Sequence, residues 1–145
     1  MLAVELDKAA VKAFMGQLLR EEIFDQFEVR TIDIATNIRI NIECQTEEGF
    51  STWADLRPVV TAIIKTSPKP SHVKIVFSYK AAEACEIHEN AAALFLNLAY
   101  ENDGVAFTTG TSQKQFLMEK SLDTNWDEWV KGFFAKGDIV VTNRE

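Results

Sequence analysis

The chain has few of the residues on which secreted and membrane proteins depend. Cys44 and Cys85 are its two cysteines, too few for a disulfide framework, so we predict that both are buried free thiols. Glu5, Asp7 and Lys8 interrupt the apolar residues near the beginning of the sequence, and no later apolar run approaches the roughly 18 residues of a membrane span. These absences predict a cytoplasmic protein that does not bind a membrane.

Positive charge and chain-breaking residues are also scarce. The 15 lysines and arginines are outnumbered by 22 aspartates and glutamates, and the net charge of −7 argues against nucleic acid as a partner. Three prolines and six glycines are too few for a long flexible linker, whereas a hydrophobic share of 47% is enough to build a core. We therefore predict one globular domain over residues 1–145.

Two helices are expected in the first half of the chain. Residues 2–6 have the pattern of a short edge strand, and the helix after them is expected to use Asp7 as its N-cap. The second helix contains Pro58, which is tolerated in a first turn. That favours Asp55 as the second N-cap. The alternative, Thr52, would leave Pro58 inside the helix at the cost of a hydrogen bond.

A β-hairpin is expected between these helices, over residues 27–44. Isoleucines alternate with polar residues there, which is the period of a half-buried strand. A three-residue loop at residues 35–37 would pair Ile34 with Ile38 and keep both on the core side. Asn37 would then take the left-handed conformation.

Three further elements precede the last third of the chain. The proline-containing stretch Thr66–Ser71 is expected to be a stiff loop. Alternation over residues 73–79 predicts a strand, and residues 81–90 predict a short helix.

The next region predicts a three-stranded meander. A type I′ turn at residues 103–104 would pair Tyr100 with Phe107. A four-residue loop at residues 110–113 would then pair Phe107 with Phe116. In this arrangement the apolar residues of all three strands share one face.

An aromatic helix is expected to cover that sheet. Asp123 or Thr124 is its predicted N-cap, Gly137 its predicted end, and residues 139–142 a predicted edge strand. The order of elements predicts an α+β fold, namely a mostly antiparallel sheet of about six strands built from hairpins, with three to four helices packed mainly on one face.

Several segments resemble an uncharacterised bacterial family that is catalogued only as a domain of unknown function. The matching pieces are VKAFMGQLL, STWADLRPVV, KIVFSY, LFLNLAY and TTGTSQKQF with KSLDTNWDEWV, and they span most of the chain. The resemblance implies a soluble bacterial domain. It implies no activity and no catalytic residue.

The most site-like local feature is the turn predicted over residues 108–112. Glycine beside hydroxyl groups can form a nest of backbone N–H groups that binds an anion. We therefore take as candidate anion ligands Thr109, Gly110, Thr111, Ser112 and Lys114. The plain alternative is a hairpin loop with solvated hydroxyls, because the Lys and helix start of a P-loop are missing.

Aromatic residues supply the second candidate site. The predicted interface or pocket residues lie on the second and last helices: Trp53, Arg57, Trp126, Trp129 and Phe133. Aromatics at helical spacing are more often plain core, although one of them is expected at the rim. The cysteines and histidines do not have zinc-site spacing, so no metal and no cofactor is predicted.

Charge is segregated along the chain. Residues 56–82 contain basic but no acidic residues, and residues 81–113 contain acidic but no basic residues. Chance segregation is the plain explanation. The functional one is a non-catalytic interaction module that docks on a protein partner or forms a homo-oligomer. The alternative is a small-ligand-binding domain with an apolar cavity between the C-terminal helix and the sheet. The third hypothesis is an enzyme with an anion site at Thr108–Ser112.

Overall fold

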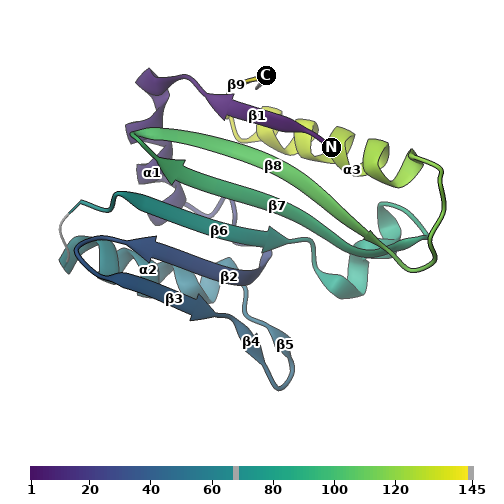
Figure 1. Ribbon diagram of the computed structural model, residues 1–145, viewed down its shortest axis with the longest axis horizontal. Coiled ribbons are helices and arrows are strands. Elements are labelled where there is room, and N and C mark those ends of the chain that lie inside the picture. Colours follow the sequence, from purple (N-terminus) through teal and green to yellow (C-terminus); the bar gives the residue numbers. More distant parts are fainter. Residues whose placement is uncertain (67–68, 144–145) are drawn as a thin grey trace.

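The computed structural model describes residues 1–66 and 69–143. Within them, seven strands form one antiparallel sheet in the order β3-β2-β6-β7-β8-β1-β9 (Figure 1). The strands are β1 (Ala3–Leu6), β2 (Glu28–Ala35), β3 (Arg39–Glu43), β6 (His72–Ser78), β7 (Ala91–Glu101), β8 (Gly104–Gln113) and β9 (Val141–Asn143). A small hairpin, β4 (Gln45–Thr46) with β5 (Gly49–Phe50), projects beyond the end of β3.

Three α-helices lie on one side of the sheet and leave its other side uncovered (Figure 1). They are α1 (Val11–Arg20), α2 (Trp53–Thr66) and α3 (Ser121–Lys136), and two 3-10 helices are η1 (Lys8–Ala10) and η2 (Ala81–Glu86). This is an α+β fold with a large antiparallel sheet, as the alternating patterns predict. Side chains that alternate toward the helices form the core, and those that alternate away form the open face.

Aromatic residues fill the layer between the helices and the sheet. Phe24 and Phe27 lie between α1 and β2, and each is 1% exposed. The Phe24 ring stacks on Phe77 of β6, with 4.9 Å between ring centroids, and Phe107 of β8 meets Phe134 of α3 at the same distance. The aromatic core therefore joins all three helices to the middle strands.

The β2–β3 hairpin has the predicted parity but a register shifted by two residues. Ile34 pairs with Ile40 instead of Ile38, and the three loop residues lie one position later, with Ile38 exposed in the loop. Asn37 does not have a positive φ angle. Alternation determines which face a residue occupies, and a shift of two residues preserves the face, so the pattern could not exclude this register.

The predicted helix starts are confirmed in part. Asp7 is the N-cap residue of η1, which leads directly into α1, but its side chain makes no capping hydrogen bond. Helix α2 begins at Trp53, so Pro58 is its sixth residue, as the Thr52 alternative requires. Helix α3 begins at Ser121, where burial of Leu122 extends it beyond the predicted caps at Asp123 and Thr124. Tertiary packing determines these starts, and Gly137 ends α3 as predicted.

The turn between β7 and β8 is formed by Asn102 and Asp103, whose φ angles are 52° and 60°. Tyr100 therefore pairs with Val105, and Leu98 with Phe107. The predicted turn at residues 103–104 is displaced by one position, and its pairing by two residues. Two consecutive left-handed residues match a type I′ turn, which asparagine and aspartate tolerate.

The predicted third strand of the meander does not exist. Strand β8 continues through the expected loop to Gln113, and Phe116 is 80% exposed in the loop before α3. The second partner of β8, besides β7, is β1, with Phe107 opposite Val4. Strand β1 is therefore inside the sheet instead of at its edge, and the edge is β9, which covers Val141–Asn143.

Two smaller predictions also change. Cys44 is buried, but Cys85 on η2 is exposed, so only one of the two free thiols belongs to the core. The predicted helix over residues 81–90 is the 3-10 helix η2, which is shorter. Of the predicted loop Thr66–Ser71, residues 67–68 lie outside the described residues.

Candidate functional site

The candidate anion residues lie on strand β8 and the first loop residue after it, and strand alternation separates them. Thr109 and Thr111 point toward α3, where their hydroxyls donate to carboxylates of Asp127 (2.6 Å) and Asp123. Ser112 is exposed on the other side of the strand. The two threonine hydroxyls therefore act as ties between β8 and α3. Anion binding remains a prediction, with two carboxylates beside it that oppose it electrostatically.

Lys114, the fifth of these residues, lies after the end of β8. Its backbone N–H donates to the Asn90 carbonyl at 2.9 Å. Its ammonium group lies 2.9 Å from the sulfur of Cys85. These contacts hold the loop after β8 against η2 and the beginning of β7. The structure does not bring Lys114 into a shared pocket with the threonine hydroxyls.

The aromatic candidates are mostly core. Trp53 and Trp126 are completely buried, and their indole N–H groups donate to the carbonyls of Leu18 (3.2 Å) and Phe95 (2.9 Å). Trp129 is half-buried and stacks on Trp126, with ring centroids 5.2 Å apart.

Phe133 lies on the other side of Trp129, with the ring planes 7° from parallel. Trp129 is thus the aromatic at the rim that the helical spacing predicted. Beside it, burial raises the pKa of the Tyr79 hydroxyl.

Arg57 joins α2 to the loop before β2. Its guanidinium donates twice to Asp25, with Nη2 to Oδ2 at 2.9 Å and Nε to Oδ1 at 3.1 Å. The hydrogen bond to this carboxylate raises the pKa of Arg57 further above its usual value. Both oxygens of the carboxylate accept a bond from Arg57, so this arginine has a structural role in the observed conformation.

A cavity of about 360 Å³ lies at the end of the C-terminal helix. Its lining comes from α3, β1, β9 and the segment between α3 and β9, and includes Leu2, Phe134, Ile139 and Val141. The site is near the predicted cavity between the last helix and the sheet, but Trp126, Trp129 and Phe133 are not part of its lining. Ligand binding there remains a prediction.

A serine–histidine contact that the sequence did not reveal lies beneath the start of α3. His88 Nε2 is 2.8 Å from Ser121 Oγ, and the backbone N–H of Asn90 donates to His88 Nδ1 at 3.0 Å. Because Nδ1 accepts a hydrogen bond, a neutral ring carries its N–H at Nε2 and donates a hydrogen bond from it to the serine hydroxyl. A serine nucleophile needs the opposite direction of transfer. Ser121 in turn donates to Glu119, so the contact orders the start of α3.

The acidic charge block of the sequence does not lie at one place in the fold. Glu83 and Glu86 lie on η2 near one end of β7, whereas Glu101 lies at the other end of that strand. The basic Lys69 is paired with Asp103 at 2.6 Å. The acidic block is therefore divided between the two ends of β7, and docking through complementary charge remains a prediction. In the part of the chain that the structure describes, no cluster of three or more His, Cys, Asp or Glu could hold a metal ion.

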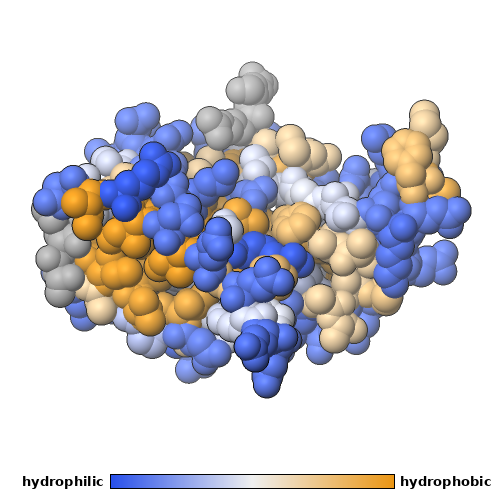
Figure 2. Space-filling model, turned by 60° about the horizontal axis from the view of Figure 1, so that its bottom comes forward, coloured by the Kyte–Doolittle hydropathy of each residue, from blue (hydrophilic) through white to orange (hydrophobic). Residues whose placement is uncertain are grey.

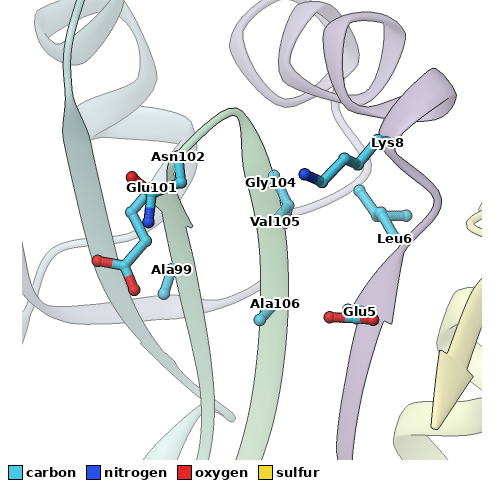
Figure 3. A pocket seen from close by; sticks show the side chains of 9 residues that line it. All are labelled: Glu5, Leu6, Lys8, Ala99, Glu101, Asn102, Gly104, Val105 and Ala106. Carbon is cyan, nitrogen blue, oxygen red and sulfur yellow. The ribbon is translucent and has the colours of Figure 1, made fainter. Parts of the chain in front are cut away.

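A shallow depression of about 230 Å³ lies on the open face of the sheet, at the β7–β8 turn (Figure 3). Its floor is made of small residues, Ala99, Gly104 and Ala106. Lys8 reaches toward the turn from one side, and Glu101 lies on the other (Figure 3). The depression exists because the side chains at these three positions of β7 and β8 are small. It is not formed by a set of converging polar groups.

Among the described strands, β3 is the longer of the two edge strands of the sheet. No described strand pairs with its outer edge. Thr36 N–H donates to the Ile38 carbonyl and Cys44 N–H to the Arg30 carbonyl, so the even-numbered residues of this strand bond inward to β2. By the antiparallel alternation, the backbone groups of Arg39, Asn41 and Glu43 point outward.

The side chains of β3 are charged on one face and apolar on the other. Arg39 donates to Asp33 at 2.5 Å, and this hydrogen bond holds the pKa of Asp33 below its usual value. On the other face, α2 lies behind β2 and β3 in Figure 1, and Figure 2 shows an apolar area over this part of the molecule. The apolar residues of β3, its loop and α2 that are exposed or half-buried include Ile38, Ile40, Ile42, Leu56, Val59 and Ile63.

Residues 17–142 match a family of unknown function, DUF5721. The chain belongs to the DUF5721 family. The match extends from the middle of α1 into β9, so it covers the β3 edge, α2 and the β7–β8 turn of this DUF5721 protein. No curated protein and no solved structure matches the chain.

The family therefore assigns no activity to any of these residues. Among the described helices of the DUF5721 protein, none is long and apolar enough to cross a membrane.

Proposed function

We propose that this protein is a cytoplasmic protein-interaction module that self-associates through the free edge of β3. The observation that carries the proposal is the self-complementary sequence of that edge, Arg39–Glu43, beside an apolar flank. Cytoplasmic location is supported by the two unpaired cysteines, because free thiols persist in reducing compartments.

The backbone of β3 allows antiparallel pairing with a second copy of itself. Arg39, Asn41 and Glu43 point their N–H and C=O groups outward, and a two-fold axis at Asn41 would place Arg39 opposite the second copy's Glu43. Outward-pointing residues then meet outward-pointing residues, as hydrogen-bonded pairs require. Three such pairs would add about six backbone hydrogen bonds and join two sheets into one.

The side chains favour the same register. Arg39 and the second copy's Glu43 would carry opposite charges at directly opposed positions, and the two-fold axis repeats the pair. On the helix side, Ile40 would lie opposite the second copy's Ile42. Charged residues on an edge strand normally discourage foreign strands. In this register they instead match each other, which favours a second copy over an unrelated strand.

The apolar flank supplies the burial that an edge strand lacks. Val59 is 50% exposed on α2, and Ile38 is 62% exposed in the loop before β3. A stable interface usually buries about 800 Å² on each partner, more than one five-residue edge provides. Two α2 helices brought together beneath the paired strands would add apolar area. The other edge strand, β9, has three residues and offers a shorter ladder.

Charge exchange across the proposed axis tests this register by sedimentation velocity at low salt. Arg39→Glu and Glu43→Arg each place like charges at both pairs, so each variant should weaken the dimer by about tenfold. The double variant R39E/E43R restores opposite charges and should dimerise like the wild type. An equimolar mixture of the two single variants should form a heterodimer.

Lys74→Glu is the matched control, because Lys74 lies on β6, inside the sheet and away from its edge. It should leave the dimer unchanged. A strictly monomeric wild type over a wide concentration range would overturn the proposal. So would a dimer that all of these charge changes leave intact. Circular dichroism establishes that each variant is folded before its association is interpreted.

A further inference from the structure

A second surface, distinct from the β3 edge, has the chemistry of a ligand site. A groove of about 490 Å³ runs between α1, the end of α2 and the β7–β8 turn. Its volume is within the roughly 300–1,000 Å³ of small-molecule sites. We refer to it as the lysine groove, and its lining residues are Lys8, Val11, Lys12, Met15, Leu19, Ile64, Lys69, Pro70, Tyr100 and Asp103.

The floor of the lysine groove is aliphatic. Met15 and Leu19 lie four residues apart on α1, so both are on the same side of that helix. Both are half-buried and pack against the core, and Ile64 of α2 meets them from the other side. An extended alkyl chain could cover such a floor without leaving a polar group unpaired.

The rim of the groove is positive, although the whole chain is negative. Three lysines and one aspartate line it, which makes its formal charge +2 on a protein of net charge −7. Asp103 is already bonded, since it accepts from Lys69 at 2.6 Å and from the Tyr100 hydroxyl at 3.2 Å. Lys8 and Lys12 form no ion pair with the described residues. Their ammonium groups are therefore available to an anion.

We infer that the lysine groove binds a free amphiphile with a single anionic head, such as a long-chain carboxylate. The head would lie between Lys8 and Lys12, and the alkyl chain would lie over Met15, Leu19 and Ile64. Lys8 extends from η1 toward the β7–β8 turn (Figure 3), and it lines the lysine groove as well as the depression on the open face. The Lys69–Asp103 pair would close the opposite side.

The chemistry separates this ligand from two others that lysines attract. A nucleic acid requires a long track of cations, and the groove has three within one depression. A membrane surface is bound by projecting apolar and basic side chains, whereas these apolar side chains form the floor of a hollow. A carboxylate or a phosphate monoester with one alkyl chain fits both the charge and the shape.

Isothermal titration calorimetry with dodecanoate below its micelle concentration tests the inference. Dodecanoate should bind saturably with one site per chain, and dodecyl phosphate should bind comparably. Acetate and dodecyltrimethylammonium should not bind, because the first lacks the chain and the second has the opposite charge. Vesicles of phosphatidylcholine and phosphatidylglycerol should not sediment the protein. Sedimentation of the protein with those vesicles, without dodecanoate binding, would overturn the inference in favour of a membrane surface.

Two sets of variants locate the site. K8E/K12E should weaken dodecanoate binding by about tenfold, since two exposed ion pairs become repulsions. Met15→Trp should also weaken it, because the indole occupies the floor. Lys74→Glu together with Lys131→Glu removes the same charge outside the groove and should bind as the wild type does.

Unchanged binding by K8E/K12E, or equal binding of the cationic amphiphile, would overturn the inference. Thermal unfolding midpoints show whether each variant is folded. Because the lysine groove does not include the β3 edge, the dimerisation of K8E/K12E should be unaffected. Failure of one proposal therefore leaves the other intact.

Discussion

Thr109 joins three elements through one hydroxyl group. It accepts a hydrogen bond from the Leu2 N–H at 2.8 Å and donates to Asp127 at 2.6 Å, while 3% of the residue is exposed. In the sequence this threonine looked like an anion ligand. In space it fixes the N-terminal strand and α3 to β8. A threonine beside a glycine has the same local sequence pattern whether it binds an anion or ties two elements together. Only the residues that surround it in the folded protein distinguish the two roles.

Thr109→Val should destabilise the protein by about 1–3 kcal/mol, because the half-buried Leu2 N–H and the Asp127 carboxylate each lose one hydrogen bond. Urea unfolding at neutral pH measures the change. Thr108→Val is the control, since Thr108 is on the opposite face of β8 and accepts one bond from Asn97. A Thr109→Val variant as stable as Thr108→Val would contradict the structural role.

Strand β1 shows how an element acquires its importance from position. It has four residues, yet it separates β8 from β9 inside the sheet. Val4 and Leu6 face the helices, and Glu5 faces away. The sequence predicted a short edge strand here, because its length and alternation give no information about neighbours 100 residues away. For the same reason, the sequence predicted a strand at Phe116, and not β1, as the second partner of β8.

Val4→Asp should prevent stable folding, because an unpaired carboxylate would be buried opposite Phe107 at a cost of several kcal/mol. Ala3→Asp, the neighbouring position on the open face, should change stability by only about 0.5 kcal/mol. Circular dichroism and thermal unfolding of both variants check the alternation. Equal damage from the two substitutions would show that β1 is not oriented as described.

The whole molecule is acidic, and its stability should depend on pH through the carboxylates that are paired. Hydrogen bonds from Arg39 and Lys69 hold the pKa values of Asp33 and Asp103 below the usual 3.8. The unfolded chain therefore takes up protons at these groups before the folded protein does. The stabilising contribution of the two carboxylates is fully present above the pKa of about 3.8 that they have in the unfolded chain. It is lost as the pH falls through their lower pKa values in the folded state.

We expect the unfolding temperature to fall on acidification below about pH 4, and to fall less steeply in D33N/D103N. The double variant already lacks the two paired carboxylates, so it has less to lose. Asp138→Asn, which alters an exposed carboxylate after α3, should keep the wild-type acid response. Identical acid profiles for all three proteins would show that the two pairs contribute nothing measurable.

The sequence by itself determined the kind of fold and the inward face of its elements. Alternation predicted β2, β3, β6, β7 and β8, and helical spacing predicted the buried aromatics of α3. These signals are local, because the period of a side chain depends only on the backbone around it. The half-buried Trp129 at the rim of α3 was predictable for the same reason.

Tertiary structure decided what local periods leave open. A shift of two residues keeps every side chain on its face, so the registers at Ile34 and Tyr100 depended on packing and turn geometry. The pairing of β8 with β1 depended on a contact between two segments that are far apart in the sequence. The outward backbone of β3 and the mouth of the lysine groove likewise exist only after distant segments have met, which is why neither candidate surface was visible in the sequence.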